Sequence, residues 1–258
     1  MSETVWINGD FRDRSEARLA ALSSSALYGS GVFTTVRIIS GKPFLWEKHW
    51  RRLAANAVAV GIDVSEYGAA AVEAPLYELI RRNGILNGRA RITAFDESPA
   101  GIWPSGSTGR TSILIMTGEL REVPADFRLT FSPYRVNSAS PIAGIKSCNY
   151  LENLLALDEA RSRGLNEAIR LNERREIAGG CMSNVFWVKG GRIFTPSLNT
   201  GCLPGTTREF ILESLDCEEA EAVYLTSAGL GIVAAARLDE RGLDTSDSLR
   251  LGRLLPAG

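Results

Sequence analysis

The chain has 258 residues, 45% of them hydrophobic, and a formal net charge of −1 from 29 basic and 30 acidic residues. This length can bury a substantial core in one large or two modest domains, and the charge balance argues against a nucleic-acid or membrane-surface protein. No apolar run approaches the roughly 20 residues that span a bilayer. Since residues 1–4 (MSET) also lack the apolar core of a signal peptide, we expect a cytoplasmic location.

The first half of the chain predicts short strands and two helices. Alternating, β-branched and aromatic residues predict strands over 4–8, 31–40, 89–95 and 112–117, and the turn at 41–42 predicts a returning strand at 43–46. Apolar residues spaced by three and four predict helices over about 47–60 and 68–82. Glycine, proline and serine are dense in residues 96–111, which predicts a loop.

The second half mixes strands and helices. Strands are predicted near 127–133, 168–172, 184–189, 192–195 and 222–226. Helices are predicted over 149–163, where Asn149 and Glu152 form a capping-box pattern, and from Thr206 onward. The polar stretch 118–124 marks a boundary, so we expect an N-terminal domain (1–118), a linker (119–124) and a larger C-terminal domain (125–258). This pattern is typical of a two-domain α+β or α/β enzyme.

Two scarce residue types narrow the chemistry. His49 is the only histidine, which excludes a metal site with several histidine ligands, and no G-x-S-x-G elbow accompanies it. The four cysteines form no C-x-x-C pair, so we expect free thiols and no metal site. Only four lysines occur. Because arginine cannot form an imine with an aldehyde, a lysine in an unusual position is informative.

Lys146 occupies such a position in GIKSCNYLENLLA (144–156), between a small apolar run and the start of a predicted helix. An ammonium group there would be partly desolvated, which lowers the pKa of a lysine and favours the neutral, nucleophilic amine. The same segment also fits an ordinary loop lysine whose charged end reaches water.

Three other segments could bind an anion. CLPGTTR (202–208) leads into a predicted helix, and helix starts bind phosphate through their backbone amides. LTSAGLGIV (225–233) offers Ser227 and turn amides, and EKHWRRL (47–53) offers Arg52. Taken alone, these segments also fit a capped helix, an ordinary turn and a surface arginine.

Together and in this order, the segments resemble the class IV aminotransferases, the pyridoxal-phosphate enzymes of fold type IV. That group includes branched-chain and D-amino-acid aminotransferases and aminodeoxychorismate lyase. The resemblance covers nearly the whole chain and is most specific in YGSGVFTTVR (28–37), in 144–156 and in 183–208. It implies a two-domain fold of the D-amino-acid aminotransferase type, pyridoxal 5′-phosphate as cofactor, a small-molecule amino substrate and a homodimer.

The resemblance also implies roles for individual residues. Lys146 matches the lysine that forms the Schiff base and moves protons, and Thr35 matches a threonine that the lyase branch keeps near the substrate. The implied cofactor-binding positions are Arg52, Lys146, Tyr150, Gly179, Thr206, Thr207, Ser227 and Ala228. The implied substrate positions are Tyr28, Phe33 and Arg37, with Arg110 as a further candidate.

One family position differs in this chain. Family members carry a glutamate five residues before the asparagine of S-N-[VIL]-F, which here is Asn184, and that position is Gly179. In the family this glutamate meets the pyridine nitrogen and keeps it protonated, so that the ring accepts electrons. In an extended segment Glu176 would face the opposite side, and the Cys181 thiol is a poor partner. We therefore expect weakened carbanion chemistry, unless a distant carboxylate moves in, and better-preserved cofactor binding.

The expected activity is that of aminodeoxychorismate lyase, which releases pyruvate from 4-amino-4-deoxychorismate and leaves 4-aminobenzoate. GSGVFTTVR and AGIK-x-x-N look closest to that branch. Against it, the lyase branch tends to carry arginines where this chain has Asp96 and Glu97. The alternatives are a branched-chain or D-amino-acid aminotransferase that uses 2-oxoglutarate, and, because of Gly179, an impaired relative that only binds the cofactor.

Overall fold

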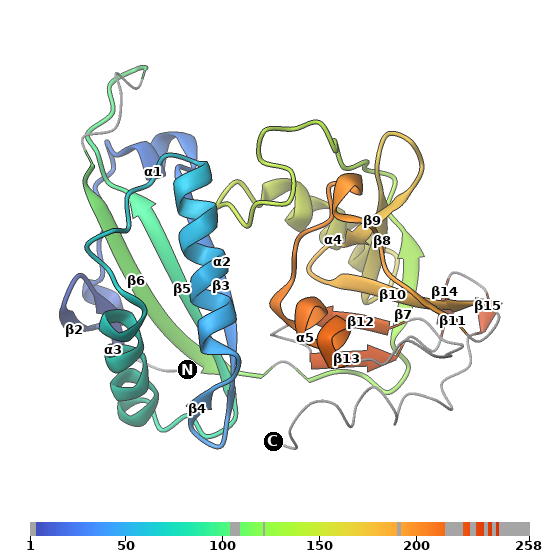
Figure 1. Ribbon diagram of the computed structural model, residues 1–258, viewed down its shortest axis with the longest axis horizontal. Helices are drawn as coiled ribbons and strands as arrows, with labels where there is room; N and C mark the ends of the chain where they lie inside the picture. Colours follow the sequence, from blue (N-terminus) through green and yellow to red (C-terminus); the bar gives the residue numbers. More distant parts are fainter. Residues whose placement is uncertain are drawn as a thin grey trace. The chain divides into compact units, whose positions relative to one another are not determined.

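The computed structural model describes residues 4–103, 109–120, 122–189, 192–214, 224–227, 231–234, 237–238 and 241–242. The chain divides into two compact units (Figure 1). The N-terminal unit contains Met1–Leu120 and Ile145–Asn149, and the C-terminal unit contains Arg121–Gly144 and Tyr150–Ala257. The segment that carries Lys146 thus belongs to the N-terminal unit. The domain ranges 1–118 and 125–258 with a linker at 119–124 stay a prediction.

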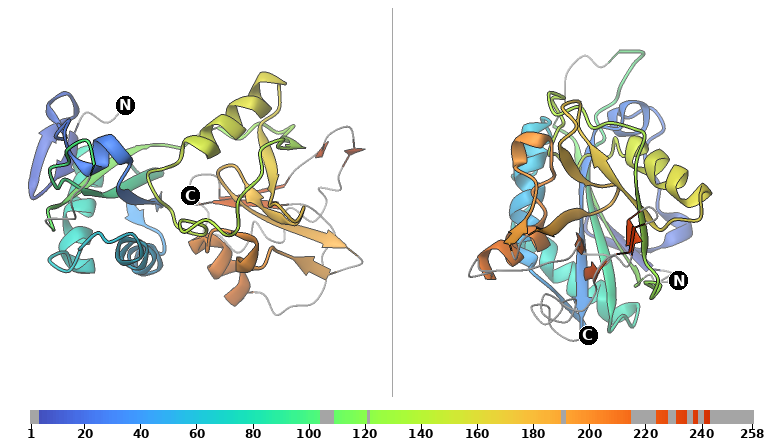
Figure 2. Two further views of the ribbon diagram at one scale, coloured as in Figure 1. Left: turned by 90° about the horizontal axis from the view of Figure 1, so that it is seen from above. Right: turned by 90° about the vertical axis from the view of Figure 1, so that its right-hand side faces the viewer.

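The N-terminal unit is built on a six-stranded sheet with the order β2-β1-β6-β5-β3-β4. Its strands are β1 (Thr4–Ile7), β2 (Asp10–Asp13), β3 (Gly31–Ile39), β4 (Lys42–Pro43), β5 (Gly88–Asp96) and β6 (Thr111–Glu119). Besides the short η1 (Arg14–Glu16) and α1 (Ser24–Tyr28), the unit has two long helices, α2 (Trp46–Ala59) and α3 (Ala69–Arg82). Both long helices cover the same face of the sheet (Figure 2).

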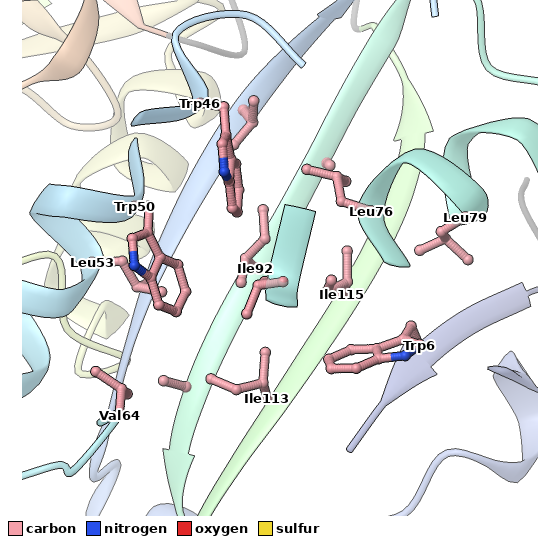
Figure 3. Close-up of a cluster of buried hydrophobic side chains, with 14 of the residues drawn as sticks. Trp6, Trp46, Trp50, Leu53, Val64, Leu76, Leu79, Ile92, Ile113 and Ile115 are labelled. Carbon is pink, nitrogen blue, oxygen red and sulfur yellow. The ribbon is translucent and has the colours of Figure 1, made fainter. Parts of the chain in front are cut away.

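Alternation along β3 decides which residues enter this core. Val32, Val36 and Ile38 are buried in one cluster with residues of α2, α3, β5 and β6. Figure 3 shows part of this cluster, including Trp50 and Ile92. Because successive side chains of a strand point to opposite faces, Phe33, Thr35 and Arg37 lie on the other face of the sheet. That face is therefore not occupied by α2 and α3.

In its described residues, the C-terminal unit contains two smaller sheets and, besides one short 3-10 helix, two helices. A five-stranded sheet has the order β15-β14-β7-β8-β9, and a four-stranded sheet has the order β11-β10-β12-β13. The first comprises β7 (Arg128–Phe131), β8 (Glu167–Leu171), β9 (Ile177–Gly180), β14 (Arg237–Leu238) and β15 (Arg241–Gly242). The second comprises β10 (Asn184–Lys189), β11 (Arg192–Phe194), β12 (Tyr224–Ser227) and β13 (Gly231–Ala234). The helical elements are α4 (Leu151–Ser162), η2 (Leu198–Thr200) and α5 (Thr206–Ser214).

The predicted returning strand at 43–46 is wrong beyond its first residue. Strand β4 ends at Pro43, Leu45 has φ 57° in the left-handed region, and α2 begins at Trp46. The rings of Trp46 and Trp50 stack with their centroids 6.0 Å apart inside the core. Burial of these two indoles on one helix face outweighs the β-propensity of the aromatic residues.

The predicted capping box at Asn149 and Glu152 is also wrong. Helix α4 has Tyr150 as its N-cap and no side-chain cap hydrogen bond. The Asn149 amide instead donates to the Gly29 carbonyl oxygen at 3.2 Å. The Glu152 carboxylate accepts from Arg170 Nη2 at 3.1 Å. Both side chains therefore form long-range contacts that the local spacing does not encode.

Candidate active site

Lys146 is held against the beginning of β3. Its carbonyl oxygen accepts from the Phe33 amide at 2.9 Å, and the Cys148 amide donates to the Gly31 carbonyl oxygen at 2.7 Å. Lys146 is only 9% exposed, and its Nζ lies 4.5 Å from the centroid of the Phe33 ring. Of the two interpretations that the sequence left open, the loop lysine that reaches water is therefore wrong.

Burial and two arginines change the basicity of this lysine. Desolvation is the largest effect, and the positive charges of Arg52 and Arg91 add to it, so the pKa of Lys146 falls from 10.5 to about 7. Near neutral pH a substantial fraction of the side chain is thus the neutral amine. A neutral amine is the form that attacks an aldehyde.

This lowered pKa predicts a pH-dependent stability for the cofactor-free protein. Between pH 7 and 10.5 the unfolded chain holds a proton that folded Lys146 has released, so the free energy of unfolding rises with pH. Relative to a Lys146→Met variant, the unmodified protein should gain a few kcal/mol across this window, measured by urea denaturation. A stability difference that does not change with pH would contradict the lowered pKa.

A buried hydrogen-bonded cluster lies between β3 and α2. Arg52 Nη2 donates to the Thr34 hydroxyl oxygen at 2.9 Å, and that hydroxyl lies 2.7 Å from His49 Nδ1. Desolvation, Arg52 and Lys146 hold the pKa of His49 well below its usual value. The imidazole ring of His49 is therefore neutral near neutral pH. This cluster fixes the side chain of Arg52 on the β3 side of α2.

The substrate-side residues predicted on β3 share one face with arginines from β5. In the β3–β5 ladder, Thr35 pairs with Arg91 and Arg37 pairs with Arg89. Directly opposed residues of antiparallel strands lie on the same face. Arg91 Cζ lies 3.6 Å from the centroid of the Phe33 ring. We call the set Arg37, Arg89 and Arg91 the arginine face.

Sequence reasoning missed Arg89 and Arg91. In the sequence of β5 they alternate with Ala90 and Ile92, which are buried. This alternation could have indicated that the two arginines lie on the face opposite the core. Only the strand pairing shows that they lie beside Arg37. The structure thereby adds two arginines to the predicted Arg37 on this face of the sheet, while positions 96 and 97 stay acidic.

Tyr28, Arg110 and two acidic residues lie elsewhere in the N-terminal unit. The Tyr28 hydroxyl donates to the carbonyl oxygens of Gly101, at 3.1 Å, and Ile102. Arg110 is exposed. Asp96 and Glu97 are buried, and their carboxylates accept hydrogen bonds from the Ser98 amide and the Ser112 hydroxyl, respectively. Their charges are thus directed into hydrogen bonds with the protein itself.

In the C-terminal unit, the predicted phosphate-binding residues begin α5. Thr206 and Thr207 are both buried. The Asn184 amide donates to the Leu203 carbonyl oxygen at 2.8 Å, and a Cβ on Gly205 would overlap the Asn184 side chain. Asn184 thus braces the turn before the helix, which requires glycine there. The first amides of a helix and its dipole favour an anion at this end.

The remaining predicted cofactor positions are spread over three places. Ser227 ends β12, where it pairs with Gly231 of β13. Ala228 lies outside the described residues. Tyr150 is half-buried at the start of α4. Gly179 lies in β9, a strand that the sequence pattern did not predict.

None of the described carboxylates near Gly179 replaces the missing glutamate. Glu176 is half-exposed and accepts from the Asn172 amide at 2.8 Å and from Arg174. Glu167 is buried, which raises its pKa, and accepts from the amides of Cys181 and Met182. A Cβ on Gly180, which faces the opposite side from Gly179, would lie 3.5 Å from Glu167 Cδ.

The residues that the structure describes contain neither a membrane-spanning helix nor a metal site. In the described part of the chain, no helix is long and apolar enough to cross a membrane. Within the same residues, no group of three or more His, Cys, Asp or Glu side chains could hold a metal ion. Cys148, Cys181 and Cys202 are free thiols, and burial raises the pKa of each.

Sequence comparison matches this chain to one enzyme family. The sequence model of the family described as "Amino-transferase class IV" matches residues 31–237. The chain is 34% identical over 218 residues to an aminodeoxychorismate lyase of Bacillus subtilis. The aligned region covers 81% of this chain and 73% of the relative. The chain is 29% identical over 219 residues to a D-alanine aminotransferase of Staphylococcus haemolyticus, which covers 80% and 73%, respectively.

Comparison with solved structures agrees with the sequence comparison. A branched-chain aminotransferase from Thermoproteus uzoniensis, solved with norvaline, matches with a TM-score of 0.89 at 26% identity. The match covers 98% of this chain and 93% of that protein. This likeness confirms the predicted mixed α/β fold of the type IV enzymes. The chain is therefore a member of the class IV aminotransferase family, enzymes that depend on pyridoxal phosphate.

Proposed function

We propose that this protein is a 4-amino-4-deoxychorismate lyase, which converts its substrate into 4-aminobenzoate and pyruvate. The observation that carries the proposal is the arginine face, Arg37, Arg89 and Arg91, on the same side of the sheet as Phe33. The substrate bears two carboxylates, and guanidinium groups are the side chains best suited to bind carboxylates in pairs. The 34% identity to the lyase of Bacillus subtilis supports the same choice.

The residues of this chain fit pyridoxal phosphate at two places. Lys146 offers a buried amine with a pKa of about 7 for its aldehyde, and the start of α5 offers buried threonines for its phosphate. We assign Arg52, Ser227 and Ala228 as further phosphate contacts and Tyr150 as a neighbour of the ring. When bound, the cofactor supplies a conjugated ring that accepts electrons from the bond that breaks.

Lys146 would also move the protons of the reaction. Whenever it is not bound to the aldehyde of the cofactor, its side chain would be a free amine. With a pKa of about 7 it can take up a proton and release it near neutral pH. We propose that Thr35 and Tyr28, with Arg110, help to position the substrate. The two products together contain all atoms of the substrate, so the lyase reaction needs no second substrate.

An aminotransferase is the alternative, because the same arginine face would also suit the two carboxylates of 2-oxoglutarate. The D-alanine and branched-chain aminotransferases among the relatives support this choice. A transaminase cannot complete its cycle without a 2-oxo acid, whereas a lyase can. The requirement for the acceptor therefore separates the two activities.

The direct test is an assay of the purified protein with 4-amino-4-deoxychorismate, with and without 2-oxoglutarate. The proposal expects equal formation of 4-aminobenzoate and pyruvate in both reactions. Product only with the oxo acid, or amino-group transfer from branched-chain or D-amino acids as the faster reaction, would replace the lyase by a transaminase. A cofactor-loaded protein without either activity would support the impaired relative.

The arginine face makes a specific prediction for Arg37→Leu. Loss of one charge-assisted hydrogen bond to a carboxylate removes about 1.5–3 kcal/mol of binding. We therefore expect KM for 4-amino-4-deoxychorismate to rise roughly 10- to 100-fold. The matched control is Arg81→Leu, an exposed arginine on α3, which should leave KM unchanged. An unchanged KM in Arg37→Leu as well would remove this residue from the substrate site.

We also propose that the protein is located in the cytoplasm and has a role in folate biosynthesis.

We propose in addition that the protein forms a homodimer. Leu151, Leu154 and Leu155 of α4 are 67%, 46% and 53% exposed, although the opposite face of α4 is packed in the unit. Neighbouring exposed leucines on one helix favour a covered surface. Light scattering after size-exclusion chromatography should give twice the monomer mass, and a monomer mass would refute the dimer.

A further inference from the structure

The position that lacks the family glutamate faces a buried arginine. In the β8–β9 pair, Gly179 lies directly opposite Arg170, so the two positions share one face of the sheet. Ala168 and Cys181 lie on the same face and pack against Ala156 and other residues of α4. This arrangement lies entirely within the C-terminal unit.

Arg170 is held in place by hydrogen bonds, but one of its buried donors has no acceptor among the described residues. It is 3% exposed, its Nη1 donates to Asn153 Oδ1 at 3.3 Å, and its Nη2 donates to the Arg135 carbonyl oxygen at 3.1 Å. Its carboxylate partner, Glu152, is 73% exposed. Arg170 Nε is buried and has no hydrogen-bond partner among the described residues. A buried donor without an acceptor is costly, which points to a missing acceptor.

Glycine at position 179 brings no side chain to this face of the sheet. Within the described structure, a Cβ built on Gly179 would come within 4 Å of one atom only, the Ser183 carbonyl oxygen, at a tight 3.2 Å. No carboxylate at position 179 therefore competes with Arg170 on this face.

We propose that Arg170 takes the place of the missing glutamate and donates a hydrogen bond to the pyridine nitrogen of pyridoxal phosphate, which therefore carries no proton. This inference rests on the proposed binding of that cofactor. A guanidinium group is always charged and only donates hydrogen bonds, so its neighbour must be an acceptor. A carboxylate at position 179 would have the opposite effect, because it favours a protonated nitrogen.

An unprotonated ring accepts electrons less readily, and this consequence bears on the type of reaction. Transamination of an ordinary amino acid depends on the ring to stabilise the charge left after proton loss. Release of pyruvate from 4-amino-4-deoxychorismate creates an aromatic product, whose stability supplies part of the driving force. The Arg170–Gly179 pair therefore favours lyase over transaminase chemistry.

The test is the ¹⁵N chemical shift of the ring nitrogen in protein loaded with ¹⁵N-labelled pyridoxal phosphate, followed against pH. The unmodified protein should show an unprotonated nitrogen at neutral pH. In Arg170→Met, the pH of half-protonation should rise by about one unit or more. The control Arg163→Met removes an exposed arginine of the same unit and should leave the titration unchanged. In Arg170→Met/Gly179→Glu the nitrogen should be protonated at neutral pH.

A protonated nitrogen in the unmodified protein would overturn the inference without the need for any variant. An unchanged titration in Arg170→Met would overturn it as well, since another group would then set the protonation. Both results would leave the proposed function intact, because the cofactor is bound. Failure of the unmodified protein to bind the labelled cofactor through Lys146 would instead overturn the proposed function together with this inference.

Discussion

Replacement of Lys146 by alanine is expected to abolish the visible absorbance band that forms when the protein is mixed with pyridoxal phosphate. Lys146, which is 9% exposed and has a pKa of about 7, provides the amine for the aldehyde. Alanine has no amine, and arginine at this position would keep a charge but form no imine. Formation of 4-aminobenzoate should fall by at least about 1,000-fold, because the covalent bond and the proton carrier are lost together.

Lys42→Ala provides the matched control for this experiment. Lys42 is an exposed lysine in β4 of the same unit, and its removal should change neither the band nor the rate. Urea denaturation of both variants checks that each is folded. A Lys146→Ala protein that keeps the band would assign the covalent bond to another lysine and remove the basis of the proposed mechanism.

Replacement of Arg52 by alanine should weaken pyridoxal-phosphate binding by roughly 10- to 100-fold. A charge-assisted hydrogen bond to a phosphate contributes about 1.5–3 kcal/mol, which corresponds to this change in Kd. Arg51 is an adjacent and exposed arginine on α2, so Arg51→Ala should change Kd less than about twofold. Spectrophotometric titration of the cofactor-free proteins measures all three dissociation constants.

Pyridoxal, which lacks the phosphate, separates a phosphate contact from a structural role. Arg52 Nη2 also donates to Thr34, so its loss could disturb the cluster with His49. If Arg52 binds the phosphate, its removal should weaken pyridoxal phosphate far more than pyridoxal. Equal weakening of both compounds would show that Arg52 acts only through the cluster.

Local patterns in the sequence predicted most of the long elements correctly. Strands β3, β5 and β6 follow from alternation and helices α2 and α3 from apolar spacing, and α5 begins at Thr206 as predicted. The errors fell where a long-range contact decided the conformation. Trp46 entered a helix because its indole is buried in the core with residues of β3, β5 and β6, and Asn149 bonded to Gly29 instead of capping α4.

The sequence by itself determined the chemistry of single positions: a lysine beside an apolar run, a glycine and two threonines at a helix start, and glycine in place of a glutamate at position 179. Such features depend on residue type and short spacing. Only the tertiary structure decided the burial of Lys146, the pairing of Arg37 with Arg89, and the placement of Arg170 opposite Gly179. The physical reason is that strand register joins segments distant in the chain. The register is set by backbone hydrogen bonds and by the packing of whole faces, which no short stretch of sequence contains.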